Sequence, residues 1–134
     1  SMGGLILHRA LTFEPDVDLT HRVFVATPHR GCRLARRSRK SPFARLMSEA
    51  VRMASVGVPI PPWPAHTGVV VGSKDRTVTP AEGDLPDADD RLVLPFAHNE
   101  LVLRPNLAHA THRFLAHGTF DAPLALDLNG DTFP

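Results

Sequence analysis

Three short apolar runs constrain the fold of this chain more than any other feature. They cover residues 21–26 (HRVFVA), 67–73 (TGVVVGS) and 91–96 (RLVLPF), and they are rich in β-branched and aromatic side chains. Runs of this length and composition are typical of strands that are buried in a parallel sheet. Because parallel neighbours need crossover connections, we expect helices between the runs.

Helix signals occur between and around these runs. A short apolar helix is predicted over residues 5–11, after a pair of glycines. Another starts with Ser41 as N-cap and Pro42 at the first helical position, and a third begins at Pro105 and stops at Gly118. The buried face of the third helix is expected to comprise Leu107, Ala110, Thr111, Phe114 and Leu115.

Strands and helices therefore alternate, which predicts an α/β fold with a mainly parallel sheet and covering helices in three layers. Only a short helix after Pro80 is expected between the second and third strands. At 134 residues the chain is about one domain, which we assign to residues 1–118. Residues 119–134 have weak periodicity and are interpreted as a C-terminal tail.

Composition predicts a soluble, cytoplasmic protein. With 43% hydrophobic residues, the chain has no apolar run of the roughly 18 residues that a membrane span needs. The start also lacks the order of charges and apolar residues that defines a signal peptide. The single cysteine, Cys32, has no partner within the chain for a disulfide, so nothing indicates an oxidising compartment.

A basic stretch, RGCRLARRSRK, covers residues 30–40. Such a run can bind phosphates, and nucleic-acid binding is a weak third hypothesis for this chain. No aromatic residue is interleaved with the basic ones to stack on bases. We therefore interpret the stretch as a solvated loop that leads into the next helix, and do not expect a nucleic-acid partner.

Three residues in separate segments have the chemistry of a serine hydrolase triad. Ser1 precedes a predicted helix, Asp75 follows the second predicted strand, and His98 follows the third. A hydroxyl becomes a useful nucleophile when an imidazole takes its proton, and a carboxylate must hold that imidazole in one tautomer. The chain order Ser, Asp, His is the one used by α/β-type hydrolases.

Residues beside Ser1 fit the same interpretation. The backbone N–H of Met2 is a candidate oxyanion donor. Gly3 is expected to avoid a Cβ clash in a sharp turn, and Gly4 to let the helix pack closely on the sheet.

Four segments carry a family resemblance. Residues 1–5 (SMGGL) are similar to the end of the G-H-S-M-G-G-L nucleophile elbow of α/β-hydrolase esterases and lipases. Residues 23–31 (VFVATPHRG) resemble the strand and loop after the elbow helix in bacterial members. Residues 69–80 (VVVGSKDRTVTP) resemble the acid strand and loop, and residues 95–118 resemble the histidine loop and final helix.

The resemblance implies a partial α/β-hydrolase fold, beginning at the elbow, and hydrolysis of carboxylic esters with Ser1 as nucleophile, Asp75 as acid and His98 as base. It places His29 as a pocket wall near the nucleophile. No metal and no cofactor are expected. Cys32 stands where the family loop usually has serine, and we interpret it as a substitute small residue.

The family's elbow also requires a strand before the serine and a second oxyanion donor from another loop, and no residues of this chain precede Ser1. We therefore expect a complementing N-terminal segment or a homo-oligomer as partner. The alternative function is a non-catalytic hydrolase fragment that acts as an associating fold.

Several single residues also fit a second role. A Ser-Met pair is also what an expression vector leaves at an N-terminus, and Asp75 alone is also typical of a turn. An N-terminal-nucleophile hydrolase would use the α-amino group of Ser1 as base, but the glycines and helix that follow do not favour it.

His109 and His112 have the spacing of a helical metal pair, but no carboxylate or cysteine completes the set, so a solvated pair is favoured.

Overall fold

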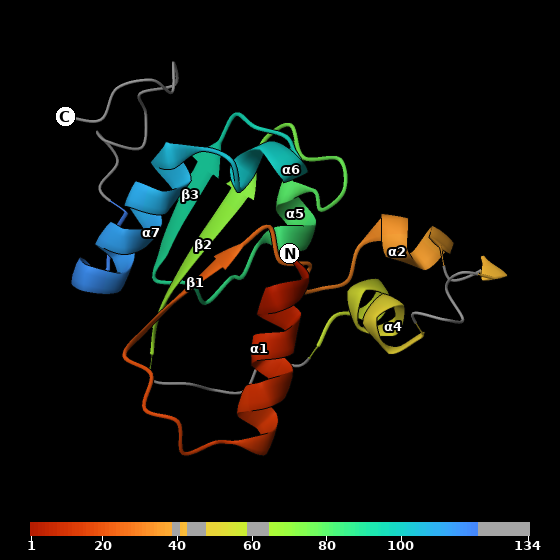
Figure 1. Cartoon of the computed structure of the whole chain (residues 1–134), viewed down its shortest axis with the longest axis horizontal. Coiled ribbons are helices and arrows are strands. Elements are labelled where there is room, and N and C mark those ends of the chain that lie inside the picture. The colour runs from red at the N-terminus through yellow and green to blue at the C-terminus, as the bar shows by residue number, and fades with distance from the viewer. Residues whose placement is uncertain (39–40, 43–47, 59–64, 121–134) are drawn as a thin grey trace.

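A parallel sheet of three strands lies between helices in the computed structural model (Figure 1). The structure describes residues 1–38, 41–42, 48–58 and 65–120. Its elements are, in chain order, α1 (Met2–Phe13), β1 (His21–Val25), α2 (Arg33–Ser38), α4 (Ser48–Val56), β2 (His66–Gly72), α5 (Pro80–Gly83), β3 (Asp90–Leu94), α6 (His98–Leu101) and α7 (Pro105–His117).

The strands lie in the order β1-β2-β3, and both pairings are parallel. In the register, Val25 pairs with Val70, and Val70 pairs with Leu92. All three predicted strands are thus present within one or two residues of their expected bounds, and the predicted α/β fold is confirmed.

Helix α7 covers one face of the sheet. Its Leu107, Ala110 and Phe114 join Val70 and Leu92 in the largest buried cluster. The helix begins at Pro105 and is stopped, as predicted, by Gly118, which follows its last residue and has a φ of 79°, the left-handed conformation that glycine adopts most easily.

The prediction that Leu115 belongs to the buried face of α7 is wrong, because this side chain is 47% exposed. Phe114 already fills the space over the sheet, where its ring lies 4.7 Å from that of the buried Phe120. The next residue is rotated about 100° around the helix axis and so faces away from the sheet.

Helix α1 covers the opposite face. Leu7 of α1 packs against a cluster that contains Phe24 of β1 and Val69 and Val71 of β2. Helix α4 packs on α1 through Met53, Ala54 and the fully buried Leu5. The described part of the chain therefore has the three predicted layers around β1 and β2.

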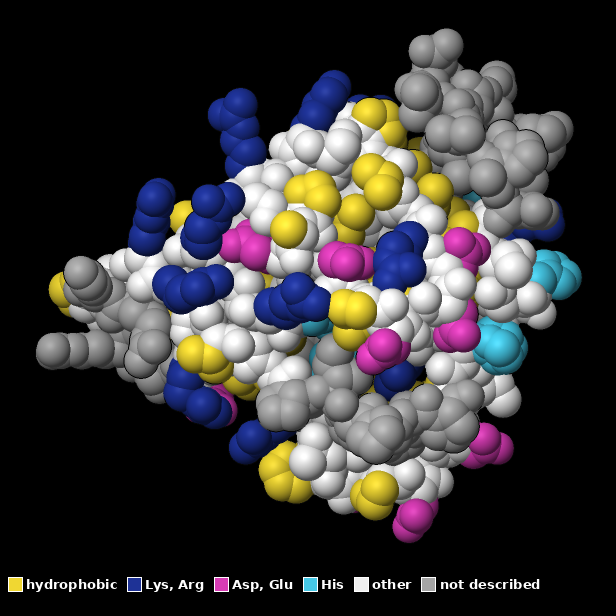
Figure 2. Space-filling view, turned by 180° about the vertical axis from the view of Figure 1, so that it is seen from behind, with side chains coloured by type: hydrophobic (Ala, Val, Ile, Leu, Met, Phe, Trp, Pro, Cys, Tyr) yellow, Lys and Arg dark blue, Asp and Glu magenta, His cyan; other side chains and the backbone are white. Residues whose placement is uncertain are grey.

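The basic stretch differs from its predicted loop, because residues 33–38 form helix α2. The backbone N–H of Ala35 donates to Cys32 Sγ, the Arg33 N–H donates to Glu82, and the helix packs against α4. No α2 side chain is buried, which explains why apolar periodicity gives no signal. In Figure 2 the Lys and Arg side chains gather on the side that carries α2 and α4 in Figure 1.

Some predictions lie outside the described residues. The helix predicted from Ser41 is confirmed in its second half as α4, whereas residues 43–47 are not described. Residues 59–64 and the predicted tail from residue 121 onward are likewise not described. Among the described helices, none is long and apolar enough to cross a membrane.

Candidate catalytic site

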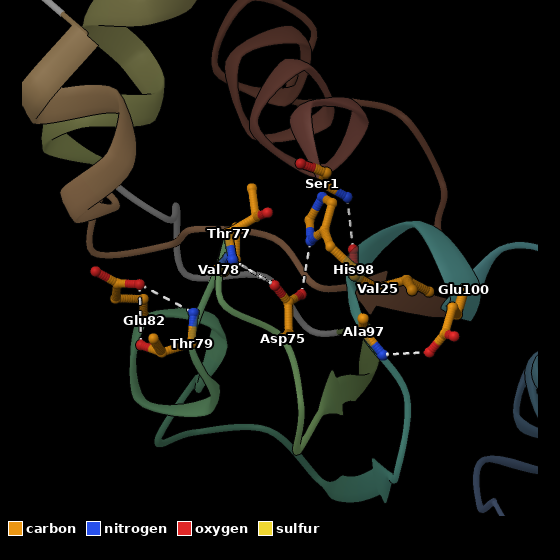
Figure 3. A network of polar contacts seen from close by, with 10 residues as sticks. All are labelled: Ser1, Val25, Asp75, Thr77, Val78, Thr79, Glu82, Ala97, His98 and Glu100. Carbon is orange, nitrogen blue, oxygen red and sulfur yellow. Dashed lines mark hydrogen bonds and ion pairs between the residues drawn. The ribbon is translucent and has the colours of Figure 1, made fainter.

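The site lies where the carboxyl ends of the strands meet the start of α1. Asp75 follows β2, His98 follows β3, and Ser1 immediately precedes α1 (Figure 3). Carboxyl ends of parallel strands share one edge of a sheet, which is where ligands bind in open α/β sheets. The sheet therefore brings together three residues that are as far apart in the chain as positions 1 and 98.

Asp75 is held rigidly. Its side chain is fully buried, and Oδ1 accepts hydrogen bonds from the backbone N–H groups of Thr77 and Val78 at 2.8 and 2.9 Å. Two donors on one oxygen stabilise the carboxylate and fix its rotamer. Oδ2 is left free to contact His98.

His98 contacts this second oxygen, with 2.6 Å between His98 Nδ1 and Asp75 Oδ2. The imidazole is 17% exposed. A carboxylate on Nδ1 selects the tautomer that carries its proton there, which leaves Nε2 as a base. Nε2 is therefore the nitrogen that could accept a proton from a nearby hydroxyl group.

His98 lies on a short helix that the sequence pattern does not predict. It is the first residue of α6, where Glu100 Oε2 accepts a hydrogen bond from the backbone N–H of Ala97 at 2.8 Å. This single hydrogen bond from the N-cap backbone fixes the chain just before His98. The histidine is thus held by a helix start rather than by an irregular loop.

Ser1 lies on the other side of the His98 ring from Asp75 (Figure 3). Its α-amino nitrogen donates to the backbone oxygen of Val25 at 2.5 Å, and burial lowers the pKa of this amino group. Ser1 is exposed, and no hydrogen bond joins its hydroxyl to His98 among the described residues. Figure 3 shows Ser1 beside the His98 ring, and a hydrogen bond between the two side chains would require the hydroxyl to turn toward Nε2.

The start of α1 supplies backbone donors beside Ser1. The first N–H groups of a helix have no carbonyl partner within it, so those of Met2 and Gly3 are available for a negatively charged oxygen. A Cβ on Gly4 would overlap the Thr27 side chain and lie 2.9 Å from Phe24, which confirms the predicted close packing. The clash expected at Gly3 is absent, because a Cβ there meets no described atom within 4 Å.

A cavity of about 280 Å³ opens beside Ser1. Its wall is mainly apolar and comes from the loop after β1, from α2, from α4 and from the segment after Asp75. The lining includes Met2, Cys32, Ala35, Ala54 and Val78. A mainly apolar cavity next to a serine can accommodate an apolar ligand group.

His29 does not line this cavity but forms a buried pair with His8 of α1. The distance between His8 Nε2 and His29 Nδ1 is 3.1 Å, and the His8 ring stacks on Phe24 with 4.5 Å between centroids. Burial lowers the pKa of His8 to about 4 and that of His29 to about 3. The cation of Arg22 lowers both pKa values further.

His8 is absent from the predicted site residues, although the sequence carries a signal for its position. His8 lies three residues after Leu5 and three before Leu11, and all three are buried. That spacing places His8 on the inner face of the helix.

The other acidic candidates have different partners. Asp84 pairs with Arg91 at 2.8 Å, Asp89 accepts a hydrogen bond from the Thr67 N–H, and Asp90 accepts one from the Phe120 N–H. Of the acidic residues between β2 and residue 120, where the described part of the chain ends, Asp75 is the one in contact with His98. Within the described ranges, no group of three His, Cys, Asp or Glu side chains could hold a metal ion.

Fold and site together define a small α/β domain with a buried aspartate–histidine pair at the carboxyl end of a parallel sheet. Comparisons with protein-family models, with curated proteins and with solved structures found no match to this chain.

Proposed function

We propose that this chain is an esterase-type serine hydrolase, in which Ser1, His98 and Asp75 act as nucleophile, base and acid. The observation that carries the proposal is the 2.6 Å contact between buried Asp75 and His98 Nδ1, with Ser1 on the opposite side of the ring. The similarity of four segments to α/β-hydrolase esterases and lipases supports the same reaction. Kinship with that family is part of the proposal.

The chemistry follows from the positions of the groups. The Ser1 hydroxyl attacks the ester carbonyl carbon while His98 Nε2 takes its proton, and the Asp75 carboxylate stabilises the imidazolium that forms. The tetrahedral oxyanion accepts hydrogen bonds from the N–H groups of Met2 and Gly3. His98 then returns the proton to the leaving alcohol, and water hydrolyses the acyl-serine by the reverse sequence.

The apolar cavity favours esters of short carboxylic acids. Its volume of about 280 Å³ corresponds to about nine waters at roughly 30 Å³ each. An acyl chain that enters it removes apolar surface from water, which stabilises the complex by about 0.8 kcal/mol for each buried CH₂ group.

The test is hydrolysis of p-nitrophenyl acetate and p-nitrophenyl butyrate by the full chain. We expect turnover of both esters, and Ala35→Phe should lower the butyrate rate about tenfold relative to acetate, because it fills the cavity. Leu103→Phe is the matched control, because Leu103 is 79% exposed and is not part of the cavity wall. Turnover no faster than in buffer would contradict the proposed function.

A further inference from the structure

The hydroxyl groups in the wall of the cavity beside Ser1 differ in what they already bind. The wall residues that carry a hydroxyl group are Ser1, Ser38 and Thr77. Ser1 is the proposed nucleophile, and Ser38 Oγ donates a hydrogen bond to the Leu34 carbonyl oxygen at 3.0 Å. Thr77 Oγ1 has no hydrogen-bond partner within the part of the chain that the structure describes. It is therefore the hydroxyl that is available to a ligand in the cavity.

Thr77 is held in a fixed position. Its backbone N–H donates to Asp75 Oδ1 at 2.8 Å, and the next N–H, that of the buried Val78, donates to the same oxygen at 2.9 Å. A β-branched side chain has few rotamers on a fixed backbone. In Figure 3 the Thr77 side chain lies on the same side of Asp75 as Ser1, with its oxygen on the side of the His98 ring. The free hydroxyl thus belongs to the end of the cavity where the reacting groups lie.

The surroundings of this hydroxyl make the choice of ligand matter. The rest of the wall is mainly apolar and includes Leu34, Ala54 and Val78. A hydrocarbon chain that fills the cavity would displace water from the Thr77 hydroxyl and leave it without a partner, which costs binding free energy. A ligand that carries its own hydroxyl group would replace the lost water, because a threonine hydroxyl both donates and accepts hydrogen bonds.

We infer that Thr77 selects acyl groups that carry a hydroxyl group, so that the substrates are esters of short hydroxy acids. This inference rests on the proposed ester hydrolysis and names its substrate class. The Thr77 hydroxyl and the hydroxyl of the acyl group form one hydrogen bond, while the carbon chain packs on the apolar wall. One hydrogen bond of this kind changes an equilibrium constant by about tenfold. Thr77 thereby determines specificity and takes no part in the bonds that form and break.

The first measurement compares p-nitrophenyl 3-hydroxybutyrate with p-nitrophenyl butyrate as substrates of the full chain. The ratio of their kcat/KM values should fall about tenfold in Thr77→Val, which replaces the hydroxyl by a methyl group of similar size. Thr77→Ser restores the hydroxyl and should restore the ratio. Thr12→Val is the matched control that should keep the ratio, because Thr12 is exposed on α1 and is not part of the wall. Comparing ratios between variants cancels the difference in intrinsic reactivity of the two esters.

The second measurement does not depend on turnover. Methyl 3-hydroxybutyrate and methyl butyrate are titrated into Ser1→Ala, and the shifts of the backbone amide NMR signals of Ala35 and Val78 give the two Kd values. The hydroxy ester should bind about tenfold more tightly, and Thr77→Val in the same chain should remove the difference.

Equal Kd values for the two methyl esters would overturn the inference, and so would a preference that persists in Thr77→Val. Tighter binding of the hydroxy ester together with no ester turnover by the parent chain would support the inference and contradict the proposed function. The two can therefore fail separately. The comparison of the two methyl esters in Ser1→Ala stays decisive if Thr77→Val does not fold.

Discussion

Replacing His98 by alanine should reduce the turnover of p-nitrophenyl acetate by about a thousandfold or more. General base catalysis by a positioned imidazole contributes about 10² to 10⁴ in rate, and the serine hydroxyl is not activated without it. Because the His98 side chain is only 17% exposed and contacts the buried Asp75 carboxylate, its loss should also lower stability, and folding must be verified. The measurement is kcat with circular dichroism as the check on folding.

The chain contains a matched control for this experiment. His66 also faces an aspartate, with 3.8 Å between its Nδ1 and Asp89 Oδ1. Both side chains are largely exposed, and His66 begins β2 whereas Asp89 directly precedes β3. His66→Ala should leave ester turnover unchanged. Equal losses in the two variants, or an unchanged rate in His98→Ala, would contradict the role of His98.

Stability should fall by about 5 kcal/mol between pH 6.5 and pH 4 because of the His8–His29 pair. The folded pKa values are about 4 for His8 and about 3 for His29. An unfolded histidine has a pKa of about 6.5, so the unfolded chain takes up protons first as the pH falls. The stabilisation from neutral histidines is complete above the unfolded pKa and is lost as the pH falls toward the folded values.

Urea unfolding at several pH values measures this effect. His8→Gln removes one titrating ring and should reduce the slope of stability against pH between pH 4 and 6.5 by about half. His66→Gln removes an exposed histidine and should leave the slope unchanged. If His8→Gln and the parent chain have the same slope, the buried pair does not govern acid sensitivity.

The sequence predicts the sheet and the Asp75–His98 pair because both depend on local patterns. Continuous β-branched runs form strands that are buried on both faces, and the carboxyl ends of parallel strands share one edge of the sheet. Asp75 and His98 follow two neighbouring strands, so the strand assignment alone brings them together. Ser1 joins them because α1 begins beside the end of β1.

The sequence does not predict α2, α6 or the histidine pair, and the physical reasons differ. Helix α2 has no buried side chain and therefore no apolar period. Helix α6 is four residues long and is capped by Glu100, three positions inside it. His8 and His29 meet only through tertiary packing, across 21 residues of chain.

Intact mass of the chain after treatment with a fluorophosphonate probe tests the central claim most directly. The probe forms a phosphonyl ester with an activated serine and releases fluoride, as an ester substrate forms the acyl-serine. We predict one adduct per chain, located on Ser1, and none in Ser1→Ala or His98→Ala. Ser38 is a second serine in the wall of the same cavity, and Ser38→Ala should keep the adduct. Absence of an adduct on the parent chain, or an adduct on Ser38, would contradict the assignment of Ser1 as nucleophile.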